Sequence, residues 1–209
     1  MSDGGDGGDV GTVVVGTRER LLSAATEQIV AGGYGATSVL AIAERAGVAA
    51  GTLYRHFASR EELFVEVFRS VCAREERAML AAAAALPVGA PAADRLEAVL
   101  TTFARRALRN PRLAWALIAE PVDPRVDAER SAYRARYAQM IASGLTAGIA
   151  AGELPACNVE LTAAALVGGC GEALVGPLSP LADGGRGGPD PADVVDGLRM
   201  FVRRAMGAP

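Results

Sequence analysis

The chain has 209 residues, of which 51% are hydrophobic and 5% aromatic, and its formal net charge is −3. This length allows one domain or two small ones with an adequate core, and abundant alanine with few aromatic residues favours packed helices over sheets. Three widely spaced cysteines without a C-x-x-C pair and a single histidine argue against a zinc site, a disulfide framework and serine–histidine–acid chemistry, so we expect no metal, no cofactor and no enzymatic activity.

The first 16 residues are rich in glycine and aspartate, which predicts a disordered N-terminal arm. They lack a basic region before an apolar core, so they do not resemble a secretory signal. The longer apolar stretches further along the chain are interrupted by charges or glycines, and none is expected to span a membrane. We therefore expect a cytoplasmic protein.

A first helix is predicted over residues 18–31, capped by Thr17 and stopped at Gly32-Gly33. The segment 37–57, TSVLAIAERAGVAAGTLYRHF, then predicts two short helices with a tight turn between them. The Thr37 hydroxyl is expected to cap the first of the pair, and Gly47 is expected to end it, because glycine tolerates a positive φ.

The second helix of the pair has two distinct faces when its residues are placed at about 100° intervals. Leu53 and Phe57 fall on one face, which must point inward, whereas Gly51 and Arg55 fall opposite. Glycine permits close approach of the backbone, and arginine pairs with guanine in the major groove of DNA. The periodicity alone is equally typical of a small amphipathic helix pair with a solvated polar face.

Three consecutive runs carry a family resemblance: Ala43-x-x-Ala46-Gly47-Val48, then residues 51–57 (GTLYRHF), then residues 59–63 (SREEL). Together they resemble the DNA-binding domain of the tetracycline-repressor (TetR) family, over about residues 18–68. The resemblance implies a helix-turn-helix domain over 17–58 and a helical effector-binding and dimerisation domain over 59–209. The candidate DNA-contacting residues are Thr37, Ala50, Gly51, Thr52, Tyr54, Arg55, His56 and Arg60.

The chain departs from the family where the second helix begins. Ala49 and Ala50 stand where the family often has a serine and then a polar or basic residue. A helix cap and one or two DNA contacts are therefore missing. The remaining exposed residues of the helix must therefore supply more of the contacts that recognise the DNA sequence.

The rest of the chain is also predicted to be helical. A capping box at residues 59–62 starts a helix that ends near Leu86, before Pro87. Further helices are predicted over 92–109, 111–119, 125–151, 159–176 and 191–206, between proline and glycine breaks. The prediction is an all-α fold with nine helices, the number that the TetR resemblance implies.

The segment 159–176 is apolar almost all round, so as a helix it must be covered on two sides. We expect a second copy of the chain to cover one side, with the last helix joining the interface, as the family resemblance implies. A central core helix within a monomer is the alternative. The candidate interface residues are Leu166, Cys170, Leu174, Val195 and Phe201.

The middle of the chain places large side chains among alanines. Alanine-rich helices leave room for a ligand, and aromatic residues supply shaped apolar walls with a few polar points. The alternative is that these aromatic residues simply fill the core. The candidate effector-binding residues are Trp115, Ile118, Glu120, Tyr133, Tyr137 and Met140.

These observations predict a ligand-responsive transcriptional regulator, a repressor that binds a double-stranded DNA operator as a homodimer and is released by a small-molecule effector. The alternative is a helical small-molecule-binding or scaffolding protein with a vestigial DNA-reading head, an interpretation that Ala49 and Ala50 favour.

Overall fold

The computed structural model describes residues 16–179 and 189–208, and the proposed N-terminal arm lies outside them apart from Gly16. The described residues form nine helices and no strand, which confirms the predicted all-α fold. The helices are α1 (Thr17–Gly32), α2 (Val39–Arg45), α3 (Ala50–His56), α4 (Arg60–Ala84), α5 (Ala92–Arg109), α6 (Pro111–Ile118), α7 (Pro124–Ala150), α8 (Val159–Leu178) and α9 (Pro191–Ala205).

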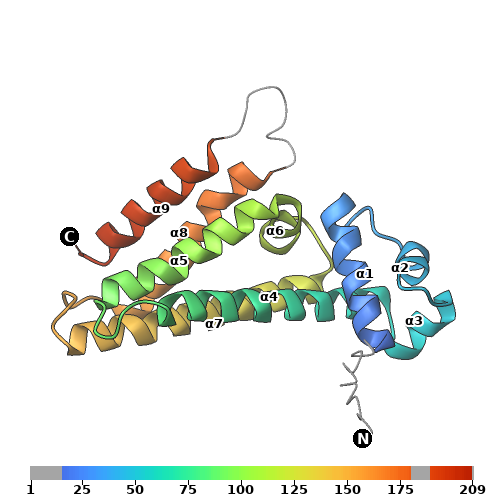
Figure 1. Cartoon of the computed structure of the whole chain (residues 1–209), viewed down its shortest axis with the longest axis horizontal. Helices are drawn as coiled ribbons and strands as arrows, with labels where there is room; N and C mark the ends of the chain where they lie inside the picture. Colours follow the sequence, from blue (N-terminus) through green and yellow to red (C-terminus); the bar gives the residue numbers. More distant parts are fainter. Residues whose placement is uncertain (1–15, 180–188, 209) are drawn as a thin grey trace, which may run out of the picture.

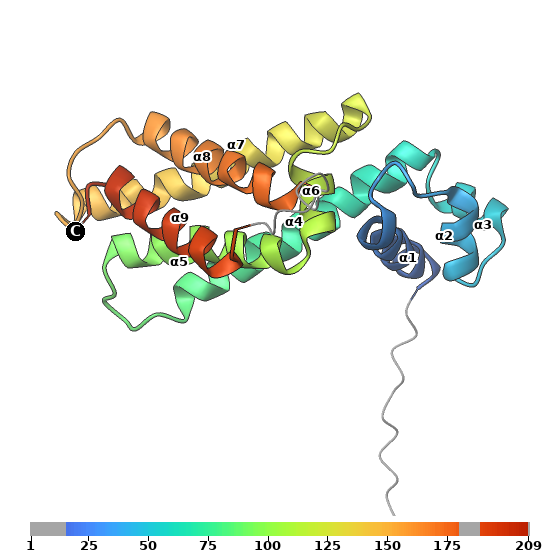
Figure 2. The ribbon, with the colours of Figure 1, turned by 90° about the horizontal axis from the view of Figure 1, so that it is seen from above.

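Helices α1, α2 and α3 form a unit at one end of an elongated molecule, and the C-terminus lies at the other end (Figure 1). Seen from above, α4 leaves this unit and runs into a bundle made by α5 to α9 (Figure 2). Two hydrophobic cores correspond to the two parts. One gathers α1 to α4 together with Leu113, Ala116 and Val126, and the other gathers α5 to α9 with Met79 of α4.

Local residue preferences explain the boundaries of the first helices, with two corrections to the predicted caps. Thr17 is the first residue of α1, and Gly16 takes the N-cap position. Ser38, not Thr37, caps α2, because the Ser38 hydroxyl accepts the Ala41 N–H at 3.1 Å. Gly47, with φ 66°, makes the predicted tight turn after α2.

Helix α4 starts at the predicted capping residues. The Ser59 hydroxyl accepts the Glu62 N–H at 3.2 Å, and the Glu62 carboxylate accepts the Ala58 N–H at 2.6 Å. The helix then continues without interruption through both cores. A continuous helix therefore joins the two parts of the chain.

Two glycines let α5 and α7 pack closely. A Cβ at Gly144 would lie 2.7 Å from Leu96, and a Cβ at Gly148 would lie 2.6 Å from Ala92. Real Cβ atoms do not approach so closely, so Gly148 requires glycine against the rigid Ala92, whereas a Cβ at Gly144 would force the buried Leu96 side chain to shift.

Helix α8 is, by length and composition alone, apolar enough to cross a membrane, which differs from the expectation drawn from the sequence. One such helix is weak evidence for a membrane, since a core helix of a soluble protein meets the same criteria. Leu166, Cys170 and Leu174 on one side of α8 are buried in the bundle. The other side is exposed, and its role is considered below.

Candidate functional site

Helix α3 presents the two faces that its sequence predicts. Leu53 and Phe57 are fully buried in the core of the α1–α3 unit, while Gly51, Tyr54 and Arg55 are exposed. The Arg55 guanidinium donates to the Thr52 hydroxyl at 3.0 Å, which holds both side chains over one surface. The Ala49 side chain offers no cap to α3, so this helix is held by its buried face alone.

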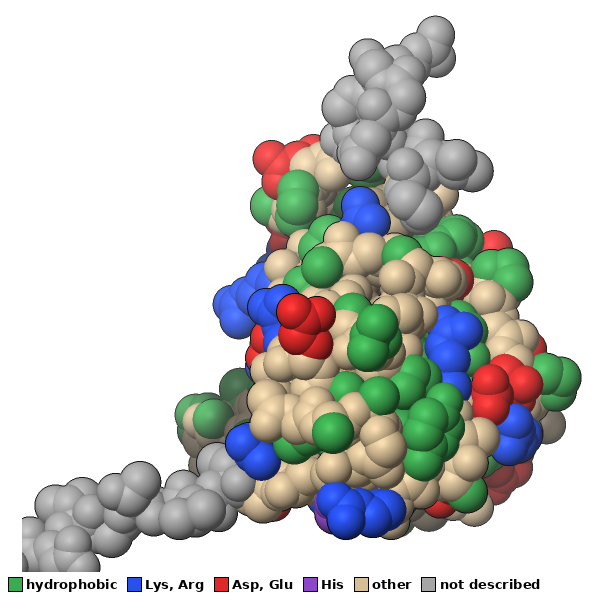
Figure 3. Space-filling model, turned by 90° about the vertical axis from the view of Figure 1, so that its right-hand side faces the viewer, with side chains coloured by type: hydrophobic (Ala, Val, Ile, Leu, Met, Phe, Trp, Pro, Cys, Tyr) green, Lys and Arg blue, Asp and Glu red, His purple; other side chains and the backbone are tan. Residues whose placement is uncertain are grey.

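The face of the molecule that carries α1 to α3 has a mixed surface (Figure 3). Arginine side chains are spread over it, with acidic groups and apolar groups between them. Two arginines of the α1–α3 unit form ion pairs, Arg18 with Glu66 and Arg45 with Glu27. Arg55 of α3 forms no ion pair within the described part of the chain, so its guanidinium matters more than the total charge of this face.

Thr37 and Arg60, two of the candidate DNA contacts, also have partners inside the protein. Thr37 is 5% exposed, and its hydroxyl donates to the Tyr34 carbonyl at 2.8 Å. The Arg60 guanidinium donates to the same carbonyl at 3.0 Å and lies over the rings of Tyr34 and Phe64. We therefore remove the buried Thr37 from the proposed DNA contacts. Arg60 is half-buried and stays a proposed contact, together with Ala50, Gly51, Thr52, Tyr54, Arg55 and His56.

A cavity of about 110 Å³ lies in the C-terminal bundle between α4, α5, α6, α7 and α8. Four of the candidate effector residues line it, namely Ile118, Tyr133, Tyr137 and Met140. Most of the other lining residues are apolar, among them Val99, Leu100, Phe103, Leu113 and Val167. A partly open, largely apolar space with a few polar groups is the form that small-molecule sites usually take.

Two of the candidate effector residues do not line this cavity. Trp115 is partly buried against the same core but is not among the lining residues. Glu120 is also absent from the lining, because its carboxylate is bound elsewhere. It accepts the backbone N–H groups of Tyr34 at 3.0 Å and of Gly35 at 3.2 Å, so it connects α6 to the loop between α1 and α2.

Charged residues that line the cavity were not identified from the sequence. Arg106 is bonded to Glu75, with 3.0 Å between Nη2 and Oε1. Arg130 and Arg134 are one helical turn apart on α7, and both also line the cavity. In a chain whose basic residues are all arginines, nothing local marks these three as different from surface arginines.

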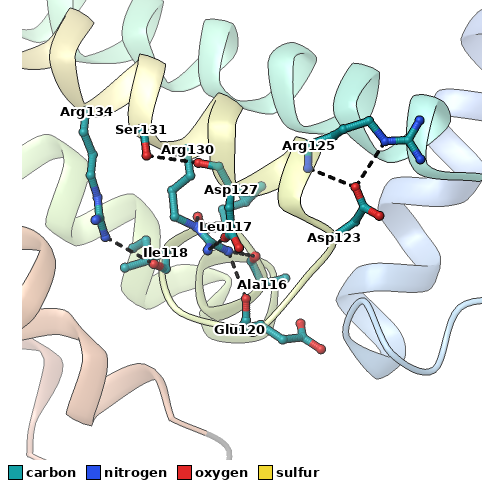
Figure 4. Close-up of polar contacts among 10 residues, drawn as sticks. All are labelled: Ala116, Leu117, Ile118, Glu120, Asp123, Arg125, Asp127, Arg130, Ser131 and Arg134. Carbon is teal, nitrogen blue, oxygen red and sulfur yellow. Dashed lines mark hydrogen bonds and ion pairs between the residues drawn. The ribbon is translucent and has the colours of Figure 1, made fainter.

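Arg130 and Arg134 hold the C-terminal end of α6 (Figure 4). Arg130 donates to the carbonyl groups of Leu117 at 2.8 Å and Glu120 at 3.0 Å, and it forms an ion pair with Asp127. Burial lowers the pKa of Arg130, although the nearby Asp127 opposes that shift. The last carbonyls of a helix lack partners within it and attract cations. Arg130 thus ties the cavity wall to the turn that carries Glu120.

Two thiols lie against the same cavity. Burial raises the pKa of Cys72 to about 12 and that of Cys170 to about 11. Burial also raises the pKa of Tyr137, whose hydroxyl donates to the Cys72 carbonyl at 3.3 Å. These groups stay neutral at physiological pH, so they add no charge to the apolar wall. No group of three or more potential metal ligands was found in the part of the chain that the structure describes.

Sequence profiles of known families match both parts of the chain. Residues 21–67 match "Bacterial regulatory proteins, tetR family", and residues 89–174 match "Tetracyclin repressor-like, C-terminal domain". The chain belongs to the TetR family. Its helix-turn-helix unit and its helical bundle are the two parts that these profiles describe.

Curated relatives of this TetR-family chain include the transcriptional repressor KstR. The chain is 38% identical to KstR of Mycolicibacterium smegmatis over 104 residues, which cover 48% of each protein. It is 39% identical to KstR of Rhodococcus jostii over 101 residues, which cover 48% of this chain and 45% of the relative. The match therefore spans about half the length of these relatives.

Solved structures share the fold at lower identity. The fatty acid degradation regulator FadR of Bacillus halodurans superposes with a TM-score of 0.74 at 17% identity, covering 91% of this chain and 96% of that one. FadR of Bacillus subtilis, in complex with stearoyl-CoA, gives a TM-score of 0.72 at 21% identity, covering 88% and 96%. At these identities the comparison establishes the TetR-family fold and no more.

The candidate interface residues lie mostly inside the single chain. Leu166, Cys170 and Leu174 are at most 1% exposed, and Val195 is also buried. A side chain without exposed surface in one chain adds no contact area when two chains meet, so these four residues are corrected to core positions. Phe201 is 40% exposed and remains a candidate.

The exposed side of α8 is a stripe of small and apolar residues at helical spacing, with one carboxylate, that of Glu172. Leu161 is 66% exposed at its start, and Gly168 has no neighbouring atom within 4 Å of the place a Cβ would occupy. Phe201 of α9 packs over Gly169, beside the stripe. The residues of this surface, called here the α8–α9 face, are Leu161, Ala164, Ala165, Gly168, Glu172, Ala173, Gly197, Met200 and Phe201.

Proposed function

We propose that this protein is a ligand-responsive transcriptional repressor that binds a DNA operator and releases it when a small molecule occupies the cavity. The observation that carries the proposal is α3, which buries Leu53 and Phe57 and exposes Gly51, Tyr54 and Arg55 within a TetR-family helix-turn-helix unit. The named function of the KstR relatives as repressors supports it.

The protein would act as a homodimer through the α8–α9 face. Helix-turn-helix proteins read two half-sites about one helical turn apart, and a two-fold dimer supplies the two reading helices. Exposed apolar surface on two adjacent helices is suited to such an interface. We place the dimer in the cytoplasm, where it would meet its DNA operator.

An effector would act through contacts that cross between the two parts of the chain. The cavity wall includes Arg130, which holds the end of α6, and Glu120 of that turn holds the α1–α2 loop. A ligand that displaces Arg130 or the end of α6 would change the position of the reading helices, and hence the affinity for DNA.

A salt-dependent gel shift on DNA that flanks the gene for this protein tests the function. We expect specific binding that weakens as salt rises, because phosphate contacts release counterions. Equal affinity for the flanking DNA and for unrelated DNA would contradict the repressor. That result would favour the helical small-molecule-binding protein with a vestigial reading head, to which Ala49 and Ala50 already point.

A further inference from the structure

We propose that the cavity takes an anionic amphiphile, an apolar chain whose negatively charged head group is bound by Arg134. Binding of this ligand is inferred from the cavity alone, whereas its release of DNA rests on the proposed function. Three features of the cavity support this ligand class: the charge of its lining, the position of Arg134 and the size of its apolar space.

The charge of the cavity lining is positive. It includes the guanidinium groups of Arg106, Arg130 and Arg134 and a single carboxylate, that of Glu75. Glu75 is bonded to Arg106 through both of its oxygens, so this pair is internally neutral. Arg130 and Arg134 are the other two cations of the lining.

Arg130 already has a full set of partners. Its side chain is 13% exposed, and it is paired with Asp127 and bonded to carbonyl groups at the end of α6. Arg134 differs, because it has no ion pair with any carboxylate in the described part of the chain. Its one hydrogen bond, from Nη2 to the Ile118 carbonyl, is 3.5 Å long, at the weak limit for such a bond. Arg134 is therefore the lining cation that is available to a ligand.

Arg134 also lies where the cavity meets solvent. Among the lining residues, only Arg134 and Asn110 are exposed, whereas the others are buried or half-buried. A head group at Arg134 would stay partly hydrated while the chain behind it entered the apolar interior. This is the arrangement that an amphiphile requires, since burying a charge fully is costly.

The size of the space favours a narrow apolar group. The cavity measures about 110 Å³, below the volume of about 150 Å³ of an engineered apolar cavity that binds benzene. A flexible alkyl chain that enters end-on from the solvent side can be enclosed in part by such a space, whereas a fused ring system requires the bundle to open. Cys72 and Cys170, both uncharged, add apolar surface to the same wall.

Binding of an anion would have a consequence for α6. The guanidinium of Arg134 would exchange its weak bond to the Ile118 carbonyl for a charge-assisted bond to the ligand. Ile118 is the last residue of α6, and Glu120 follows two residues later. The C-terminal end of α6 would then lose one hydrogen bond, close to Glu120, whose carboxylate binds the α1–α2 loop.

Calorimetric titration with three matched probes tests the ligand class: octanoate, octanol and octylamine, added to the full-length protein. Because a hydrogen bond to a charged group contributes about 1.5–3 kcal/mol, octanoate should bind about 10- to 100-fold more tightly than octanol. Octylamine should bind more weakly than octanol. Octanoyl-CoA, whose charge lies on phosphates, shows whether the head group is a carboxylate or a phosphate ester, and tight binding of either satisfies the proposal.

Two variants assign the effect to Arg134. In Arg134→Gln the preference for octanoate over octanol should disappear, while Arg134→Lys should retain part of it. Arg112→Gln is the matched control, because Arg112 is an exposed residue of α6 outside the lining and loses the same charge. That control should keep the wild-type preference.

The proposal would be overturned if neither octanoate nor octanoyl-CoA bound more tightly than octanol, or if the preference for the anionic probe were undiminished in Arg134→Gln. Gel shifts without any probe test the repressor separately. A protein that binds octanoate through Arg134 but does not bind DNA would overturn the proposed function and leave the ligand class standing.

Discussion

The carboxylate of Glu120 accepts the backbone N–H of Tyr34 at 3.0 Å, across 86 residues of sequence. Its other oxygen accepts the N–H of Gly35 at 3.2 Å, so consecutive amides of the α1–α2 loop surround one carboxylate. Successive N–H groups of this kind form an anion-binding concavity. Through this contact the turn after α6, which Arg130 holds from the cavity side, also fixes the loop that precedes α2 and α3.

Replacement of Glu120 by alanine should uncouple the cavity from the reading helices. The two N–H groups lose a charged acceptor, so the free energy of unfolding should fall by about 1–3 kcal/mol. The larger effect should be on regulation, because the ratio of operator affinities with and without effector should move toward one. Gel shifts with and without octanoate, together with urea unfolding, measure both quantities.

Glu61→Gln is the matched control for Glu120→Ala. Glu61 also joins the two parts of the chain, through an ion pair with Arg125 at 3.3 Å, but that pair is largely exposed. Surface ion pairs contribute little, so stability and coupling should change only slightly. A Glu120→Ala protein that still responds fully to the effector would show that the signal travels by another route, such as α4.

Gly33→Ala should disturb the same contact from the other side. Gly33 has φ 80° and ψ 176°, a region that is essentially restricted to glycine. A Cβ there would also lie 3.2 Å from Oε1 of Glu120. We expect a loss of about 1–3 kcal/mol of stability, measured by thermal or urea unfolding, and a reduced response to effector. Gly176→Ala in α8, where a Cβ meets nothing within 4 Å and φ is not positive, should be neutral or slightly stabilising, and equal behaviour of the two variants would contradict the strain at Gly33.

The helices and the two faces of α3 could be predicted from the sequence because their signals are local. Ser59 and Glu62 mark the start of α4, proline and glycine mark the breaks, and the spacing of Leu53 and Phe57 identifies the inward face of α3. Each of these signals acts within a few residues of the chain, where periodicity and capping chemistry determine the structure.

The contacts between distant segments could not be predicted in this way. Glu120 is predicted to bind the effector, but the amides that it binds lie in a loop 86 residues earlier. Arg60 is predicted to contact DNA, but it also binds the carbonyl and ring of Tyr34, which lies 26 residues earlier. Likewise, the apolar character of α8 does not reveal which side faces the bundle, so Leu166 and Leu174 were assigned to the interface instead of the core.

Arg55→Ala should weaken specific DNA binding. Arg55 is exposed on α3 and its guanidinium is oriented by Thr52, so contact with a base edge would contribute about 1–3 kcal/mol to operator binding. Fluorescence anisotropy with operator and with unrelated DNA measures the change. Arg60→Gln provides a contrast, because loss of its contacts to Tyr34 should lower stability as well as DNA affinity. If Arg55→Ala weakened binding to both DNAs equally, Arg55 would be a phosphate contact.

The three cysteines should differ sharply in reactivity. Cys157 is exposed, whereas Cys72 and Cys170 are buried with pKa values raised to about 12 and about 11. Since the thiolate is the reactive form, iodoacetamide at pH 8.5 should modify Cys157 rapidly and the other two only after unfolding. Mass spectrometry of timed samples checks this, and rapid modification of Cys170 in the folded protein would contradict its burial.

The same two thiols predict a loss of stability at alkaline pH. Unfolded thiols ionise near pH 8.5, while the folded state keeps both protons until the pH approaches about 11 or 12. The unfolded state therefore loses protons first, and the free energy of unfolding falls as pH rises through this interval. Cys170→Ala should flatten that fall between pH 8 and pH 10 in urea titrations. An identical slope in wild type and Cys170→Ala would remove this thiol from the explanation.

Gly168→Glu should dissociate the proposed dimer without harming the single chain. A Cβ at Gly168 meets nothing within 4 Å, and glutamate has a higher helix propensity than glycine, so the folded monomer should tolerate the change. In a two-fold interface through the α8–α9 face, the same substitution would bury an unpaired carboxylate from each chain, which is strongly unfavourable. Sedimentation equilibrium at micromolar concentration should find the wild type dimeric and Gly168→Glu monomeric, with operator affinity reduced because one chain carries only one reading helix. Ala135→Glu, at an exposed position of α7 away from that face, should remain dimeric. A dimer that survives Gly168→Glu would place the interface on another surface, and a wild type that sediments as a monomer would exclude a stable dimer at that concentration.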